Sequence, residues 1–153
     1  MPYQNEMFDH VICREVIEHT EDPEVLLREI TRVLKTSGTV LLSVSFAAKW
    51  HYIPHDYWRF TPSGLQSLIA KVGGLRIESL YRTSGDLAVT FHMAKVVLVG
   101  LLFRKSIVLK TIGVVLSPLS GLCGIVANIC EILDLGAPEN TLGYVCLLRK
   151  SLN

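Results

Sequence analysis

The sequence predicts an α/β domain built around a parallel sheet. An apolar run at residues 10–13 (HVIC) is followed by a capped amphipathic helix and then by a second apolar run at residues 39–44 (TVLLSV). Short apolar runs with β-branched residues are typical of buried parallel strands, and strand, helix and strand in this order form a right-handed βαβ unit. A chain of 153 residues is long enough for one core. We therefore expect a single domain over residues 1–153.

The helix between these two runs has clear start signals. Asp22 can cap free backbone N–H groups, Pro23 suits the first helical position, and Glu24 favours the positive end of the helix dipole. Leucine, isoleucine and valine then recur at helical spacing on one face. Gly38 is expected to end the helix.

The rest of the sheet is predicted from similar signals. Thr61-Pro62 begins a second helix that Gly73-Gly74 ends, and residues 75–82 (LRIESLYR) alternate like a half-exposed strand. Residues 141–148 (TLGYVCLL) form the last expected strand.

An apolar insert, residues 87–135, separates the last two expected strands. Residues 111–130 contain no charge and are long enough to span a bilayer. Pro118 and several glycines and serines oppose a span because they lower helicity and hydropathy. Two interpretations remain: a membrane span, or a buried or membrane-surface helical cap.

Composition excludes some classes of protein. The net charge is +1 with scattered basic residues, so nucleic acid is not an expected partner. The four cysteines form no CxxC pair, which favours reduced thiols in a cytoplasmic protein. Half of the residues are hydrophobic, and the first ten do not form a signal peptide. We expect a cytoplasmic protein, with membrane association through residues 87–135 left open.

A loop rich in aromatic residues follows the second strand, at residues 45–60. Aromatic side chains in a loop favour a lid or a binding surface. The alternative is that these rings only attach the loop to the core. The candidate residues for binding a substrate are Trp50, His51, Tyr52, His55, Tyr57 and Trp58.

Several motifs together resemble the class I S-adenosylmethionine-dependent methyltransferases, in particular the methyltransferase type 11 group. Phe8-Asp9, the EVIEH turn at residues 15–19, Asp22-Pro23 and Leu34-Lys35 match the second half of that domain. The run PHDYWRFTP at residues 54–62 is similar to one in bacterial members. The resemblance implies a Rossmann-like sheet of order 3-2-1-4-5-7-6, of which this chain supplies strands 4 to 7. No GxGxG occurs, so we expect an incomplete domain without the Gly-rich cofactor motif.

The resemblance also implies site residues. The methionine end of S-adenosylmethionine is expected beside Cys13, Arg14 and Glu15, although Cys13 is equally well explained as a core residue. The turn is similar to an E-x-x-E-H pattern that binds a divalent metal in ubiquinone-pathway O-methyltransferases, which would make Glu15, Glu18 and His19 ligands. His19 or Glu15 could instead act as a general base, and a solvated hydrogen-bonding turn is the third interpretation.

Two functions follow from this resemblance. The first is methyl transfer from S-adenosylmethionine to a small-molecule or lipid-like acceptor, with acceptor positioning as the main catalytic effect. The second is a truncated, inactive chain that acts as an interaction module or needs a partner chain. The strand at residues 11–13 would then present an unpaired edge that favours self-association.

Overall fold

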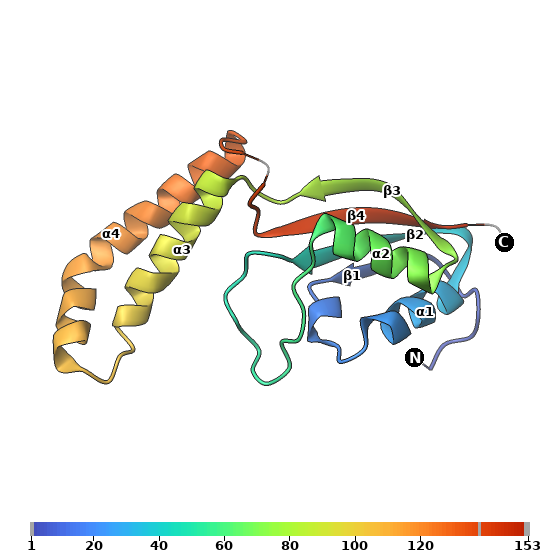
Figure 1. Cartoon of the computed structure of the whole chain (residues 1–153), viewed down its shortest axis with the longest axis horizontal. Coiled ribbons are helices and arrows are strands. Elements are labelled where there is room, and N and C mark those ends of the chain that lie inside the picture. Colours follow the sequence, from blue (N-terminus) through green and yellow to red (C-terminus); the bar gives the residue numbers. More distant parts are fainter. Residues whose placement is uncertain (1, 138, 152–153) are drawn as a thin grey trace. The chain divides into compact units, whose positions relative to one another are not determined.

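The computed structural model describes residues 2–137 and 139–151 and contains two compact units (Figure 1). Residues 1–83 and 142–153 form the first unit, which holds the sheet. Residues 84–141 form the second, a pair of helices. The expectation of one domain over residues 1–153, with an insert at residues 87–135, stays a prediction.

The first unit contains a four-stranded sheet of order β1-β2-β4-β3. Its strands are β1 (Phe8–Arg14), β2 (Leu34–Ser45), β3 (Leu75–Arg82) and β4 (Gly143–Lys150). β1 runs parallel to β2, and β4 is antiparallel to both β2 and β3. This is the arrangement expected for strands 4, 5, 7 and 6 of the Rossmann-like template, so the predicted incomplete α/β fold is confirmed.

Two helices cover one face of this sheet, α1 (Pro23–Val33) and α2 (Pro62–Val72). Each begins at the predicted cap: the Asp22 carboxylate accepts hydrogen bonds from two backbone N–H groups, and the Thr61 hydroxyl accepts one from Gly64 N at 3.1 Å. Their leucines and isoleucines share one core cluster with buried residues of β2 and β4. Both helices therefore pack on the same side.

The other face of the sheet is open among the described residues. In β2, Val40 and Leu42 are fully buried under the helices, whereas Leu41 between them is 43% exposed. In β1, Ile12 is 74% exposed. Because side chains alternate across a strand, these exposed residues lie on the face that α1 and α2 do not cover.

The predicted end of the first helix is wrong. α1 ends at Val33, and Leu34 already has extended dihedral angles (φ −78°, ψ 133°) as the first residue of β2. Gly38 lies within β2, where the pairing with β1 shifts register. A Cβ atom there would lie 2.8 Å from the Asp9 carbonyl oxygen, so Gly38 permits close strand contact rather than ending a helix.

The second unit is a hairpin of two helices, α3 (Asp86–Leu101) and α4 (Ile107–Ile132), which lie side by side (Figure 1). They form the predicted apolar helical insert before the last strand. Among the described residues, α4 is the one helix long and apolar enough to cross a membrane, with a mean hydropathy of 1.9. Pro118 lies inside it without ending it.

Candidate functional site

The candidate site forms where β1 and β2 end side by side. Arg14 and Glu15 come at the end of β1, and Ser43 and Ser45 close β2. The Glu15 carboxylate accepts hydrogen bonds from Ser43 Oγ at 2.8 Å and from Ser45 Oγ at 2.7 Å. The carboxyl ends of parallel strands are the usual ligand site of open α/β sheets, and this one holds a carboxylate in a fixed place.

The backbone of Glu15 is held in an uncommon conformation. Its φ angle is +49°, which is the left-handed region. Its N–H donates to the Ser43 carbonyl oxygen at 3.2 Å and to Ser43 Oγ at 3.1 Å. Such a conformation costs roughly 1–3 kcal/mol in a residue other than glycine and persists only where other contacts impose it. Strand β2 therefore fixes both the backbone and the side chain of Glu15.

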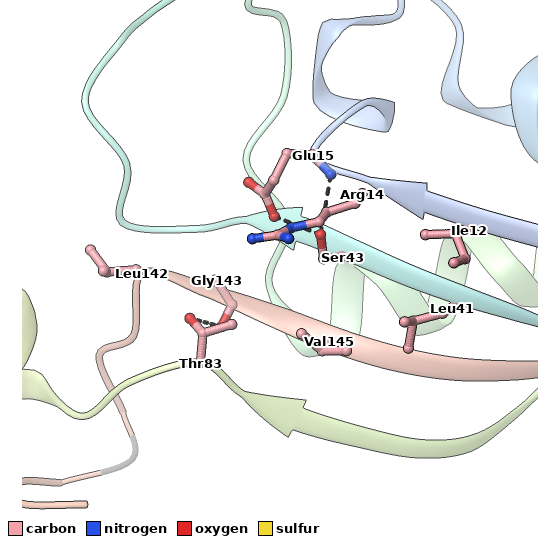
Figure 2. A pocket seen from close by; sticks show the side chains of 9 residues that line it. All are labelled: Ile12, Arg14, Glu15, Leu41, Ser43, Thr83, Leu142, Gly143 and Val145. Carbon is pink, nitrogen blue, oxygen red and sulfur yellow. Dashed lines mark hydrogen bonds between the residues drawn. The ribbon is translucent and has the colours of Figure 1, made fainter. Parts of the chain in front are cut away.

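A cavity of about 420 Å³ lies beside Glu15 on the open face of the sheet (Figure 2). Arg14, Glu15 and Ser43 supply its polar groups, whereas Ile12 and Leu41 lie on its apolar side. The full lining is Ile12, Arg14, Glu15, Leu41, Ser43, Thr83, Leu142, Gly143 and Val145. Such a cavity suits a ligand with an apolar body and one polar or charged end.

Glu15 carries a negative charge in this cavity. Burial alone would raise its pKa, but the hydrogen bonds from Ser45 and Ser43 and the charge of Arg14 outweigh burial and lower the pKa. A carboxylate that accepts hydrogen bonds is stabilised in its ionised form. Glu15 is therefore ionised at neutral pH.

Glu18 behaves in the opposite way. Its side chain is completely buried, and neither carboxylate oxygen has a hydrogen-bond partner among the described residues. Burial raises the pKa of Glu18, and the nearby charge of Glu15 raises it further. The environments of the two carboxyl groups therefore favour the ionised form of Glu15 and the protonated form of Glu18.

Cys13 lies on the other side of the sheet from the cavity. It is buried in the core cluster under the helices and does not line the cavity. Burial raises the pKa of its thiol to about 11, with a contribution from Glu18. Cys13 is thus a core thiol, whereas Arg14 and Glu15, the other two predicted cofactor contacts, do line the cavity.

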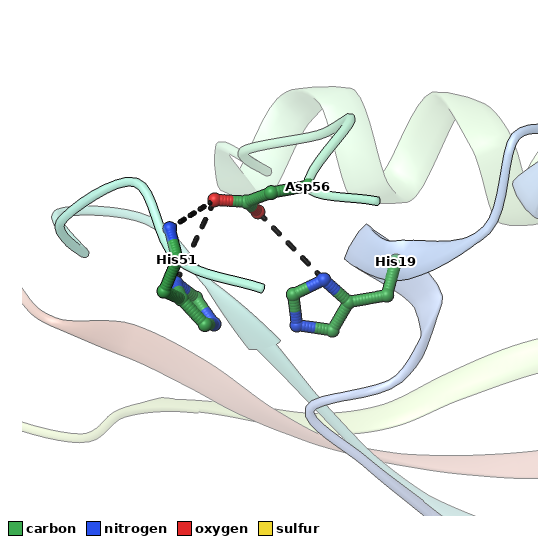
Figure 3. Close-up of side chains that lie close together, drawn as sticks. All are labelled: His19, His51 and Asp56. Carbon is green, nitrogen blue, oxygen red and sulfur yellow. Dashed lines mark hydrogen bonds and ion pairs between the residues drawn. The ribbon is translucent and has the colours of Figure 1, made fainter. Parts of the chain in front are cut away.

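His19 faces the aromatic loop rather than the cavity. Its Nδ1 lies 2.7 Å from the His55 carbonyl oxygen, and its ring meets that of His51 edge-on with centroids 4.8 Å apart. Asp56 lies beside both rings: its Oδ1 is 3.8 Å from His19 Nδ1, and its Oδ2 is 3.6 Å from His51 Nδ1 (Figure 3). The Asp56 carboxylate is sealed from solvent and takes two hydrogen bonds from Arg59, at 2.6 and 2.8 Å. Arg59 holds the pKa of Asp56 well below its usual range.

This cluster is the one metal-ligand grouping found within residues 2–137 and 139–151. Ligand atoms of His19, His51 and Asp56 lie within 4.8 Å of one another. However, Arg59 already binds both carboxylate oxygens, and its positive charge opposes a cation. The hydrogen bonds account for the arrangement without a metal.

The ligand set predicted from the sequence, Glu15, Glu18 and His19, does not form one group: the carboxyl groups of Glu15 and Glu18 lie next to each other, but His19 does not join them. Glu18 points into the core, and His19 is directed to the loop. A divalent metal at these three residues therefore has no support in the structure.

The aromatic loop is attached to the turn that follows β1. The backbone N–H groups of Tyr57 and Trp58 both donate to the Glu18 carbonyl oxygen, at 2.9 and 3.2 Å. Trp58 Nε1 donates to the Thr20 carbonyl oxygen at 2.9 Å, and the Tyr57 hydroxyl donates to Glu21 at 3.2 Å. Tyr57 and Trp58 therefore hold the loop in place, as the alternative interpretation of this loop proposed.

The remaining aromatic residues of the loop are more exposed. Trp50 and Tyr52 are 62% and 69% exposed, and His51 and His55 are also exposed. Trp50, Tyr57 and Trp58 share a hollow of about 300 Å³ that is separate from the cavity beside Glu15. None of the six predicted substrate-binding residues lines the Glu15 cavity. A role for them in binding an acceptor stays a prediction.

Four residues of the site were not singled out from the sequence: Ser43, Ser45, Asp56 and Arg59. Two serines at i and i+2 at the end of an apolar strand project on one face, which was the available signal for the first pair. The spacing of Asp56 and Arg59 by three residues was the signal for the second.

Fold and site together define a class: a Rossmann-like α/β protein with a ligand cavity at the carboxyl ends of its parallel strands. Residues 1–42 match the family described as "Methyltransferase domain". The resemblance read from the motifs is thereby supported, and the chain has part of the class I S-adenosylmethionine-dependent methyltransferase fold. No curated protein sequence matches the chain.

Several solved structures with the same fold align with nearly the whole chain. The [4+2]-cyclase SpnF is 16% identical with a TM-score of 0.54, covering 100% of this chain and 53% of its own. A putative sarcosine dimethylglycine methyltransferase from Galdieria sulphuraria is 14% identical with a TM-score of 0.54, covering 99% and 56%. Phosphoethanolamine N-methyltransferase 2 from Haemonchus contortus, in complex with phosphomonomethylethanolamine and S-adenosylhomocysteine, is 17% identical with a TM-score of 0.52, covering 99% and 35%.

These similarities concern the fold. The chain spans about half the length of the first two structures. The presence of a cyclase beside methyltransferases shows that this fold hosts more than one chemistry, so function has to be argued from the site.

Proposed function

We propose that this chain contributes part of a catalytic site, beside the methionine end of the cofactor and the acceptor, for S-adenosylmethionine-dependent methyl transfer to a small-molecule or lipid-like acceptor. The observation that carries the proposal is the ionised Glu15, held by Ser43 and Ser45 at the head of a cavity in a methyltransferase fold. The Haemonchus protein, whose bound ligand is a small phosphorylated amine, supports a small acceptor.

The residues of the cavity fit one end of the cofactor. S-adenosylmethionine carries positive charge at its sulfonium and amino groups, and the Glu15 carboxylate suits such a charge. The described residues offer no Gly-rich turn and no acidic residue placed for ribose hydroxyls. We therefore assign only the methionine end of the cofactor to these residues.

The cofactor, when bound, supplies an electrophilic methyl group. The chain's own residues would orient the acceptor and exclude water beside the cavity. Glu15 is placed to accept a proton from an acceptor hydroxyl or amine, because it lines the cavity. His19 is a weaker candidate for this base, since its ring is engaged with the loop.

Titration calorimetry with S-adenosylmethionine tests this proposal. We expect binding by the chain, weakened at least about tenfold by Glu15→Gln, which removes a charge-assisted interaction. The matched control is Glu131→Gln, an exposed glutamate of α4, which should leave the affinity unchanged. Binding that Glu15→Gln does not alter would contradict the proposed site.

A second candidate function is favoured by the open edge and face of the sheet. β1 is an end strand of the sheet order, and Ile12 on it is 74% exposed. Unpaired strand edges recruit other chains, so the chain could act as an interaction module that pairs with itself or with a partner. Sedimentation velocity over a concentration series measures this: self-association that Ile12→Lys abolishes, without any cofactor binding, would favour the module over the enzyme.

A further inference from the structure

The surface of the α3–α4 hairpin is apolar where a water-soluble hairpin is polar. On α4, Val114, Val115 and Ile125 are 63%, 70% and 60% exposed. Only 17% of the residues in the most apolar part of α4 are buried. Within the part of the chain that the structure describes, α4 is therefore not a helix enclosed by a protein core. A contiguous exposed apolar surface of this kind marks a contact with another apolar phase.

The side of α4 that packs against α3 shows the complementary pattern. Its buried residues are small: Gly113, Cys123, Ala127 and Cys130. A Cβ atom at Gly113 would lie 2.9 Å from the backbone nitrogen of Leu102, which shows how closely the two backbones approach there. Small residues between helices and large aliphatic residues outside are typical of helix pairs in lipid, and water-soluble pairs show the reverse.

The distribution of charge points to lipid as the occupant of this surface. Residues 111–130 of α4 contain no charged side chain, and at 1.5 Å per residue they measure about 30 Å. Positive charges gather where the two helices connect, at Arg104, Lys105 and Lys110. Basic residues beside an apolar helix surface attract anionic head groups.

We propose that the α3–α4 hairpin embeds the large aliphatic face of α4 in a lipid bilayer, with Arg104, Lys105 and Lys110 at anionic head groups. The hairpin lies in the membrane interface rather than crossing it. α3 has 16 residues, about 24 Å of helix, which is shorter than the hydrocarbon core. Lys95, near the middle of α3, is exposed and would be costly at the centre of a bilayer. This inference does not depend on the proposed methyl transfer.

Flotation of the full chain with vesicles tests the proposal. We expect co-flotation with phosphatidylcholine vesicles that persists at high salt, and stronger binding when phosphatidylglycerol is added. The double variant Val115→Gln/Ile125→Gln should lower partitioning into vesicles by at least about tenfold, because it removes two aliphatic side chains from the face of α4 that is proposed to enter the bilayer. Arg104→Gln/Lys105→Gln should remove the preference for phosphatidylglycerol and keep binding to neutral vesicles.

The matched control is Val25→Gln, which replaces an aliphatic residue of α1 that is 61% exposed and should leave flotation unchanged. Circular dichroism checks that the variants keep their helices, which is expected since the replaced side chains are exposed. No flotation with either vesicle, or flotation that high salt abolishes, would overturn the proposal. So would a hairpin-dependent dimer that forms in place of vesicle binding.

Discussion

Glu15 and Glu18 show how one turn gives two carboxyl groups different properties. They are three residues apart, yet Glu15 accepts hydrogen bonds from two serines and Glu18 is buried with no partner among the described residues. Placing titratable groups in environments that push their pKa values apart is how folds assign acid and base roles. The pair therefore favours a negative charge on Glu15, which lines the cavity, and a proton on Glu18, which does not line it.

Replacing Glu18 with glutamine should stabilise the protein at neutral pH. The pKa of Glu18 is raised in the folded chain, so the unfolded chain loses its proton first as pH rises above about 4.3. Stability then falls with rising pH between that value and the raised pKa. Glu18→Gln removes this loss and should raise the free energy of unfolding by about 1–2 kcal/mol at pH 7, with a smaller gain near pH 4.

Urea unfolding at several pH values measures this effect. Glu131→Gln is the control, because Glu131 is an exposed glutamate of α4, and the stability curve of this variant should match that of the unchanged protein at each pH. A stability gain for Glu18→Gln that is equal at pH 4 and pH 7 would show that ionisation of Glu18 is not the cause.

At the scale of elements, two glycines of α4 offer a direct comparison. A Cβ atom at Gly113 would meet the backbone of Leu102 at 2.9 Å, whereas at Gly121 nothing lies within 4 Å. Alanine favours a helix over glycine by about 1 kcal/mol. We therefore expect Gly121→Ala to raise the thermal stability of the hairpin and Gly113→Ala to lower it, as followed by the helical signal in circular dichroism. Equal gains at both positions would mean that the helices do not approach closely at Gly113.

The elements that the sequence predicted well are those with local signals. The caps at Asp22 and Thr61 begin α1 and α2 as expected, because capping depends on residues only two or three positions away. The end of α1 was missed because a register shift between β1 and β2, a long-range feature, takes Gly38 into the sheet. The pattern around Gly38 resembles a helix end when only neighbouring residues are considered.

The same contrast between local signals and long-range contacts holds for the candidate site. Arg14 and Glu15 were predicted from their place after a strand, and they line the cavity. A regular helical turn would have put Glu15, Glu18 and His19 on one face, but the positive φ of Glu15 precedes a single short turn over Ile17–His19. The partners of His19 lie more than thirty residues away in the loop, and spacing along the chain does not reveal them.

At the scale of the whole molecule, the strands that flank the hairpin are already paired. Arg82 in β3 lies opposite Tyr144 in β4, and Thr83 N donates to the Gly143 carbonyl oxygen at 3.0 Å. A two-residue Asn-Gly turn is the preferred connection between such strands. Replacing residues 85–141 with Asn-Gly should therefore convert β3 and β4 into an ordinary β-hairpin and leave the sheet unit folded.

We expect the shortened chain to keep the near-ultraviolet circular dichroism signal of its tryptophans, because Trp50 and Trp58 both belong to the sheet unit. It should unfold cooperatively in urea and lose vesicle binding, while any binding of S-adenosylmethionine that depends on Glu15 is retained. If the Asn-Gly version does not fold, a second version with a longer Gly-Ser connection shows whether the turn or the sheet unit itself is the cause. If both versions are unfolded, the sheet needs the hairpin for its stability, and the division of the chain into two units does not extend to independent folding.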